Sequence, residues 1–347
     1  MGGAAVTRPD RRITLIDVAR AAGVSRQTVS NAINAPDLLR PDTLTHVRAV
    51  ISRLGYQPDR GARSLRTRQS RLIGYCVPPP DPDRLGWVLD EFLHSVADAA
   101  RGADYHLVVF TPESASGELD TYATMLQTGC ADGFLLTDIA RHDRRPGWLQ
   151  RRGVPFVSYG RLSPRVGKAW VDVDGASGVA KAVDHLTGLG HRRIAFLGWP
   201  EGHRLGDDRA GGWRSAMAAH GLDAGDREYT EDTISAAARA ADRLLDLPDR
   251  PTAVIAASDS MAVGTYHAAR NRGLAPGRDL SVVGFDDTPS AALVTPALTT
   301  VSQPLRDAAR LLVEMLVARL AGEPLKRRAV LLDPVLVVRD STVSPPG

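Results

Sequence analysis

Two segments carry most of the information in this chain: TLIDVARAAGVSRQTVSNAIN, from Thr14 to Asn34, and LGYQPDRGARSL, from Leu54 to Leu65. In the first segment, apolar residues recur at helical spacing, Gly23 suits a tight turn, and Ser25 suits the N-cap of a second helix. The apolar residues are Leu15, Val18, Ala19 and Ala22 in the first helix and Val29 and Ile33 in the second. This pattern predicts a helix-turn-helix.

The start of the second helix carries Ser25, Arg26 and Gln27, side chains that suit base edges in the major groove. Arg can donate two hydrogen bonds to guanine and Gln can pair with adenine, and each good pair contributes about 1–3 kcal/mol of discrimination. Short polar residues suit phosphate oxygens, which position a helix without reading sequence; these are Thr14, Thr28, Ser30 and Asn34. An ordinary helical hairpin is the alternative interpretation.

The distribution of charge favours contact with nucleic acid. Residues 1–71 contain 13 arginines, no lysine and five aspartates, a formal charge of +8. The whole chain has a formal charge of +3, so residues 72–347 carry −5. A basic N-terminal part on an acidic body is expected of a module that displaces counterions from phosphates.

A third helix is predicted from Pro41 to Leu54, with Val47, Val50, Ile51 and Leu54 on its inner face. Together with the two quoted segments, this region resembles the headpiece of the LacI family of bacterial transcription regulators. The resemblance implies a DNA-binding headpiece over residues 1–58, of which 1–12 form a basic arm. It continues through most of the chain.

In that family a hinge follows the headpiece, and the resemblance places it at residues 59–71. It implies that residues 60–65 become helical only on DNA, where Ala62 and Leu65 of two subunits enter the minor groove and Leu65 kinks the duplex as a wedge. The further DNA contacts implied by the resemblance are Tyr56, Arg60, Arg63 and, on the recognition helix, Asn31. Asp59 and Asn31 depart from the residues usual in the family, so the operator sequence does not carry over.

Length and composition allow a sizeable core, since the chain has 347 residues of which 43% are hydrophobic. We expect a cytoplasmic, nucleoid-associated protein, because no apolar run is long enough for a membrane span or a secretory signal. Cys76 and Cys130 lie in apolar segments and are expected to be buried, reduced thiols. No cofactor or metal motif is present, so we expect neither.

From Leu72 onward, short apolar runs alternate with amphipathic helical stretches, which predicts an α/β body with parallel, doubly wound sheets. Expected strands include LIGYCV, YHLVVF, DGFLLT, PFVSYG, RRIAFLG, TAVIAAS, LSVVGFD and VLLDPVLVV. Expected helices begin near Trp87, Glu118, Gly175, Arg209, Ala236 and Asp259, and a last one spans Leu305 to Leu320.

So many strands suggest two lobes, with a first crossing at residues 170–174. The resemblance supports this, because the LacI body is similar to a periplasmic sugar-binding protein with three crossovers. We expect the body at 72–347, with lobe one at about 72–169 and 302–329 and lobe two at about 170–301 and 330–347.

Ligands of open α/β sheets bind beyond the carboxyl ends of the strands. The resemblance assigns effector contacts there to Arg209, in RAGGW, and Asp286, in VVGFDD, a pair that suits the hydroxyls of a sugar. Ser258 stands where the family usually has Asn, while Tyr229 and Asp138 match an aromatic and a polar contact more loosely. A nucleoside or nucleobase is the rival effector class.

Each effector residue also has a structural alternative. Arg209 could pair with Asp207 or Asp208, Ser258 and Asp259 could cap a helix, and Asp286 could shape a turn. His185, His191 and His203 are expected to be structural.

The chain lacks a dinucleotide-binding glycine motif, a P-loop and a nucleophile elbow, so we expect no enzyme. The sequence predicts a ligand-responsive repressor that binds a near-palindromic operator as a homodimer, since paired half-sites supply enough contact. A solute-binding protein and an α/β enzyme with an accessory DNA-binding head are the alternatives.

Overall fold

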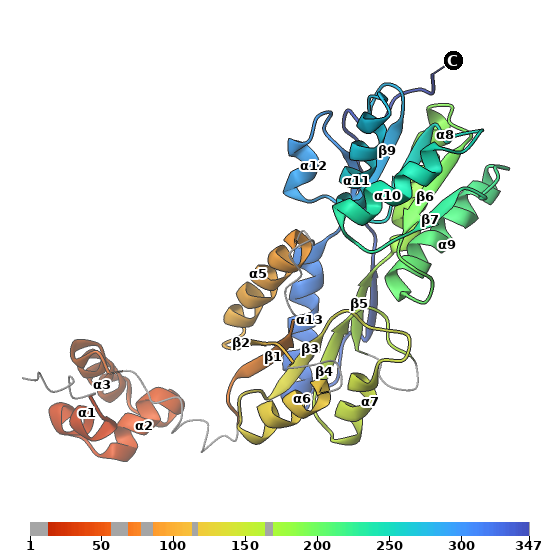
Figure 1. Cartoon of the computed structure of the whole chain (residues 1–347). Coiled ribbons are helices and arrows are strands. Elements are labelled where there is room, and N and C mark those ends of the chain that lie inside the picture. The colour runs from red at the N-terminus through yellow and green to blue at the C-terminus, as the bar shows by residue number, and fades with distance from the viewer. Residues whose placement is uncertain (1–12, 57–68, 78–85, 113–116, 164–168, 347) are drawn as a thin grey trace, which may run out of the picture. The chain divides into compact units, whose positions relative to one another are not determined.

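The computed structural model describes residues 13–56, 69–77, 86–112, 117–163 and 169–346. The chain forms two compact units, Met1–Ser70 and Arg71–Gly347 (Figure 1). The expected basic arm lies outside the described residues, as do the hinge positions Asp59, Arg60, Ala62, Arg63 and Leu65. Every helix in the described part of the chain is too short or too polar to span a lipid bilayer.

The first unit contains the three expected helices, α1 (Leu15–Ala22), α2 (Arg26–Asn34) and α3 (Pro41–Leu54), and a 3-10 turn, η1 (Pro36–Leu38). Helices of 8, 9 and 14 residues are too short to be stable alone, so their packing must hold them. Each contributes one fully buried valine, and the core consists of Val18, Ala19, Ala22, Val29, Ala32, Val47, Val50 and Tyr56.

Local hydrogen bonds fix where these helices begin and end. Thr14 and Asp17 form a capping box at α1, with the Thr14 N–H donating to the Asp17 carboxylate at 2.9 Å. Gly23 ends α1 with a φ of 63°, a conformation that glycine adopts at little cost. Ser25 Oγ accepts the Thr28 N–H at 3.0 Å and caps α2, as expected.

Lobe one of the second unit is built on a parallel sheet with strand order β11-β5-β4-β3-β1-β2. Its strands are β1 (Leu72–Cys76), β2 (His106–Phe110), β3 (Gly133–Leu136), β4 (Phe156–Tyr159), β5 (Trp170–Val173) and β11 (Ala329–Leu332). The core residues place α5 (Trp87–Gly102) and α13 (Leu305–Leu320) on one face. The other face is covered by α6 (Glu118–Gln127) and α7 (Arg144–Arg151).

Lobe two has a second sheet, with strand order β12-β10-β9-β8-β6-β7, in which only β12 runs antiparallel to its neighbour. Its strands are β6 (Ile194–Gly198), β7 (Arg227–Tyr229), β8 (Ala253–Ala256), β9 (Ser281–Asp286), β10 (Thr299–Ser302) and β12 (Val335–Val337). Its helices are α8 (Gly175–Gly188), α9 (Arg204–Ala219), α10 (Ile234–Leu245), α11 (Asp259–Asn271) and α12 (Pro289–Leu293).

The chain crosses between the lobes three times, after β5, β10 and β11. The expected boundaries at 170 and 330 were wrong by a few residues, because β5 and β11 pair with each other in the lobe-one sheet. The segment VLLDPVLVV is not one strand: Asp333 and Pro334 interrupt it, and its halves belong to different sheets. Proline has no N–H to donate to a ladder, so the break falls at the crossing.

Several short elements were missed by the sequence analysis, namely β5, β7, β10, α7 and α12. Two helices begin earlier than expected, α9 at Arg204 instead of Arg209 and α10 at Ile234 instead of Ala236. His203 and Thr233 cap these two starts through their side chains. A histidine is an unusual N-cap, which explains the miss at α9.

The cysteines and histidines are mostly structural. Cys76 is buried as expected, but Cys130 is partly exposed. His191 is buried and its ring nitrogens lie 2.8 Å from the Thr252 hydroxyl and 3.0 Å from the Ser281 hydroxyl, which ties β9 to the loops before β6 and β8.

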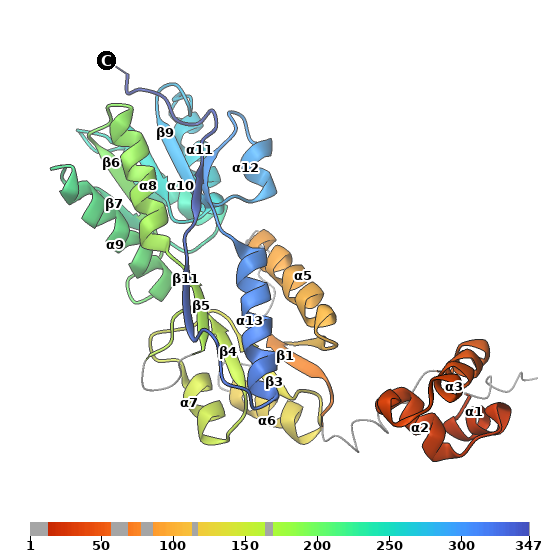
Figure 2. The ribbon, with the colours of Figure 1, turned by 180° about the vertical axis from the view of Figure 1, so that it is seen from behind.

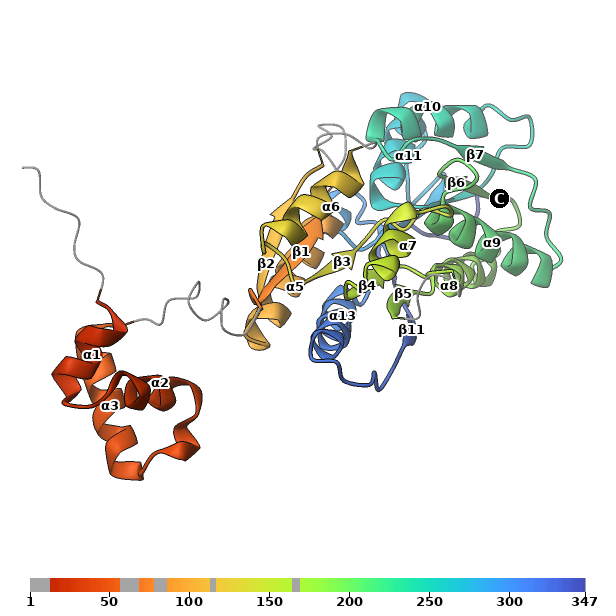
Figure 3. The ribbon, with the colours of Figure 1, turned by 90° about the horizontal axis from the view of Figure 1, so that it is seen from below.

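Helices α8 and α9 lie side by side on one face of the lobe-two sheet, in unusually close contact (Figure 3). A Cβ added at Gly212 would lie 2.5 Å from the Cα of Ala176, whereas one added at the neighbouring Gly211 would meet nothing within 4 Å. The backbone approach of the two helices therefore requires glycine at position 212.

We expect Gly212→Ala to lower the free energy of unfolding by about 1–3 kcal/mol, because α8 must move away from α9. The control Gly211→Ala should raise it by about 0.5–1 kcal/mol, since alanine is the better helix former. Thermal or urea denaturation of both variants measures the difference. Equal effects of the two substitutions would contradict the close-packing argument.

Candidate nucleic-acid interface and effector site

The N-terminal turn of α2 presents the expected base-reading side chains to solvent. Ser25, Arg26 and Gln27 are all exposed. The Gln27 side-chain amide donates to Asn31 Oδ1 at 2.8 Å, one turn along the same helix. This bond orients Gln27 and makes Asn31 part of the same exposed face, so the departure at Asn31 bears directly on which base Gln27 can reach.

The short polar residues expected at phosphates also have local partners. The Thr14 hydroxyl donates to Asp17 at 2.6 Å, and Ser25 and Thr28 share a hydrogen bond of 2.9 Å between their hydroxyls. Asn34 Nδ2 donates to the Ser30 carbonyl at 2.9 Å. Their first role is to cap and close helix ends.

Tyr56, an expected DNA contact, is part of the headpiece core. Its ring is only 9% exposed and packs in the headpiece core. The other hinge contacts lie outside the described residues.

In the second unit, Arg209 on α9 is only 5% exposed. Its guanidinium lies over the Phe285 ring at 3.5 Å, donates to the Ala257 carbonyl, and lies 3.6 Å from Asp286 Oδ1. Trp199 flanks it at 5.2 Å. The alternative partners of Arg209, Asp207 and Asp208, pair with other arginines instead.

Asp286 ends β9 with a φ of 113°, a strained value for a residue with a side chain. Its carboxylate accepts a hydrogen bond from Gln303 Nε2 at 2.7 Å. Burial raises the pKa of Asp286 to about 8, the charge of Arg209 opposes that rise, and Asp259 and Asp232 add to it. This carboxyl group is therefore able to donate as well as accept hydrogen bonds near neutral pH.

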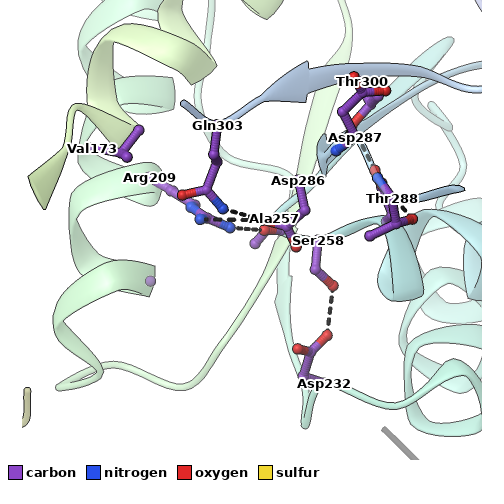
Figure 4. Close-up of polar contacts among 12 residues, drawn as sticks. Val173, Arg209, Asp232, Ala257, Ser258, Asp286, Asp287, Thr288, Thr300 and Gln303 are labelled. Carbon is purple, nitrogen blue, oxygen red and sulfur yellow. Dashed lines mark hydrogen bonds and ion pairs between the residues drawn. The ribbon is translucent and has the colours of Figure 1, made fainter. Parts of the chain in front are cut away.

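Ser258 both caps α11 and faces the same site. Its Oγ accepts the Met261 N–H at 3.2 Å and donates to Asp232 at 2.5 Å (Figure 4). Asp232 was missed by the sequence analysis. The only signal for it was its place just before Thr233, the N-cap of α10.

Asp259 is not the helix cap that the sequence suggested. It is 1% exposed and accepts hydrogen bonds from the Thr288 N–H at 2.7 Å and from the Thr300 hydroxyl at 2.6 Å. Burial raises its pKa to about 6, which the bonds from Thr300 and Thr288 oppose. It anchors the loop after β9, and so holds Asp286 in place.

A chain of hydrogen bonds leads from this site to lobe one. The Tyr159 hydroxyl, at the end of β4, donates to Gln303 Oε1 at 3.0 Å, and Gln303 in turn donates to Asp286. Gln303 lies between β10 and α13, on the second crossing. Figure 4 shows Arg209, Gln303 and Asp286 pointing toward one another.

Two of the expected effector residues contact other side chains. The Tyr229 hydroxyl bonds Glu201 at 3.3 Å, and the Asp138 side chain is 72% exposed, with His203 at 3.7 Å. The structure thus brings together Arg209, Asp286 and Ser258 but gives Tyr229 and Asp138 other partners.

Ion pairs also join the lobes at the first turn of α9. Arg161 of lobe one bonds Asp172 at 2.9 Å and reaches Asp208 of lobe two at 2.6 Å. Beside it, Arg141 pairs with Asp207 at 3.0 Å. We call the two pairs Arg161–Asp208 and Arg141–Asp207 the α9 clasp. Their aspartates directly precede Arg209 in the sequence.

Two family models match the chain. The model of bacterial regulatory proteins of the lacI family covers residues 14–59, and a periplasmic binding protein-like domain covers residues 183–342. The first includes all of α1, α2 and α3, and the second includes most of lobe two.

The comparison with individual proteins extends over the whole chain. The regulator CelR of Thermobifida fusca is 34% identical over 341 residues, 95% of this chain and 98% of its own. A solved complex of CelR with cellobiose matches with a TM-score of 0.72 at 32% identity, covering 95% and 100% of the two chains. A lac repressor dimer bound to operator matches with a TM-score of 0.80 at 26% identity, covering 96% and 100%.

These relatives are transcriptional regulators and not enzymes. Identity of this level over nearly the full length, together with the helix-turn-helix and the two-lobed body, shows that this chain belongs to the LacI family of bacterial regulatory proteins.

Proposed function

We propose that this protein is a repressor that binds a near-palindromic operator as a homodimer and responds to a small sugar in the cleft between its lobes. The observation that carries the proposal is the buried Arg209–Asp286 pair, which continues through Gln303 to Tyr159 of the other lobe. A ligand that contacts this chain would contact both lobes at once. Such a ligand can bias their relative angle.

The DNA half of the proposal rests on the exposed start of α2. Arg26 and Gln27 can each make two hydrogen bonds to a base, and the basic charge of residues 1–71 suits phosphates. A single helix-turn-helix makes too few contacts for tight binding, so two subunits are needed. The lac repressor relative is a dimer on its operator.

The effector class follows from the donors and acceptors of the site. A planar guanidinium beside a carboxyl group of raised pKa, with the Ser258 hydroxyl and the Asp232 carboxylate close by, suits vicinal hydroxyls. The CelR relative binds cellobiose. A nucleobase would favour an aromatic sandwich, and Tyr229, the expected aromatic, points to Glu201 instead.

Allosteric control would act through the α9 clasp. Arg209 and the clasp residues Asp207 and Asp208 are consecutive, so a ligand that moves Arg209 also moves the residues that hold lobe one. A coupling of about 1–3 kcal/mol changes operator affinity about 5- to 150-fold. A regulator of this kind works where the chromosome is, so we infer the cytoplasm.

We expect Gln27→Ala to reduce discrimination between the operator and single-base variants of it by about 1–3 kcal/mol at one position of each half-site. Binding to unrelated DNA should not change, because Gln27 carries no charge. Titrations of a selected operator, its single-base variants and a scrambled duplex provide the measurement. Unchanged discrimination at every position would exclude base contact by Gln27.

We expect neutral sugars, in a panel of mono- and disaccharides that starts with cellobiose, to raise the Tm of the protein by several degrees, since a bound ligand stabilises the native state. Nucleosides such as adenosine should not. Arg209→Lys should abolish the shift while keeping operator binding, because lysine lacks the planar fork. Arg141→Lys, on the exposed clasp pair, is the control and should keep the shift.

We expect the free energy of unfolding to fall as the pH rises from about 4 to about 8, in part because of Asp286. In this window the folded protein keeps a proton on Asp286 that the unfolded chain releases, so rising pH favours unfolding. Asp286→Asn should therefore lose less stability than the wild type between pH 5.5 and pH 8.5. Denaturation at both pH values checks this, and equal losses would contradict it.

A further inference from the structure

The parallel sheet of lobe one has two different ends. Its carboxyl ends carry Tyr159 and the loops of the cleft, whereas its amino ends lie on the opposite side of the lobe. The chain enters the lobe at this amino edge, where Arg71 precedes β1. The loop from α13 to β11 lies at the same edge, at the end of α13 away from lobe two (Figure 2).

This loop is basic and open to solvent. It contains Lys326, Arg327 and Arg328, all exposed, with Glu323 as its acidic residue. The Arg328 carbonyl accepts the Trp170 N–H at 2.9 Å, which fixes the end of the loop to the start of β5. The three charges are therefore carried next to a rigid sheet.

A second basic pair lies along the same edge. Arg151 and Arg152, at the end of α7 and before β4, are both exposed, and Arg152 lies 4.0 Å over the Trp148 ring, which orients it. Because the strand order is β11-β5-β4, this pair and the loop before β11 flank the start of β5. We call these five residues, Arg151, Arg152, Lys326, Arg327 and Arg328, the basic edge.

The basic edge contrasts with the rest of the body, since residues 72–347 carry a formal charge of −5. A local concentration of positive charge on an acidic body suits a partner rich in negative charge. The guanidinium group suits phosphate oxygens because it donates two parallel hydrogen bonds.

The length of the chain between the headpiece and lobe one limits which phosphates the basic edge can reach. Fifteen peptide links join Tyr56, the last described residue of the headpiece, to Arg71, so the two can be at most about 50 Å apart even when the chain is fully extended. The linker therefore permits phosphates held by the headpiece to come within reach of the basic edge.

We propose that the basic edge of lobe one binds backbone phosphates of the same DNA duplex that the headpiece holds. The contact is independent of base sequence, and it adds to the attraction that brings the protein to DNA and keeps it there. The contact does not involve the effector site, so its test is independent of whether the protein responds to a sugar.

The test uses the full-length protein with three substitutions, Lys326→Gln, Arg327→Gln and Arg328→Gln. Binding is measured between 50 and 200 mM salt to a selected operator and to a scrambled duplex of the same length. Affinity for both duplexes should fall by the same factor, at least about fivefold at the lowest salt. The slope of log affinity against log salt should become shallower by about five units for the homodimer, which loses three cationic side chains in each subunit, at about 0.9 for each phosphate that is no longer neutralised.

The matched control replaces three exposed arginines of lobe two, Arg192→Gln, Arg214→Gln and Arg239→Gln, with the same change in net charge. It should leave the salt slope unchanged. If both triple variants lose affinity and slope equally, only net charge matters and the proposal is wrong. A weakening confined to the operator, or no weakening at all, would equally overturn it. All six positions are exposed, so both variants should keep the wild-type Tm.

Discussion

The buried contact between the guanidinium of Arg209 and the carboxyl group of Asp286 is the interaction on which the arrangement of the body depends. A guanidinium that is 5% exposed must be compensated on every side, and here it has the ring of Phe285, the carbonyl of Ala257 and the carboxyl group of Asp286. These partners follow from α9, β8 and β9, so one side chain fixes three elements. The strained backbone of Asp286 is held by the same contacts and by the anchor at Asp259.

The contacts between the lobes are weaker, and their weakness is useful. Exposed ion pairs such as Arg141–Asp207 contribute about 0–1 kcal/mol each, and the partly exposed pair between Arg161 and Asp208 is the second such contact between the lobes. The sum is comparable to the free energies of about 1–3 kcal/mol by which ligands couple distant sites. The α9 clasp is therefore weak enough to open without unfolding either lobe.

Parallel strands give lobe one two functional ends. All its carboxyl ends lie on one side, where Tyr159 reaches toward Gln303, and all its amino ends lie on the other, where the chain arrives from the headpiece. The basic edge lies at the amino ends of the strands, although the body as a whole is acidic. The same sheet thus separates the ends that face lobe two from the ends that carry the basic edge.

The sequence by itself determined the elements whose signals are local. The helix-turn-helix, the cap at Ser25 and the range of α3 depend on residues close together in the chain, so they could be predicted. Only the tertiary structure decided that β5 and β11 join lobe one, that Asp232 faces Ser258, and that Tyr229 turns to Glu201. These depend on partners far apart in the chain, whose meeting is set by sheet pairing and packing, and a single sequence does not specify which short apolar strand pairs with which.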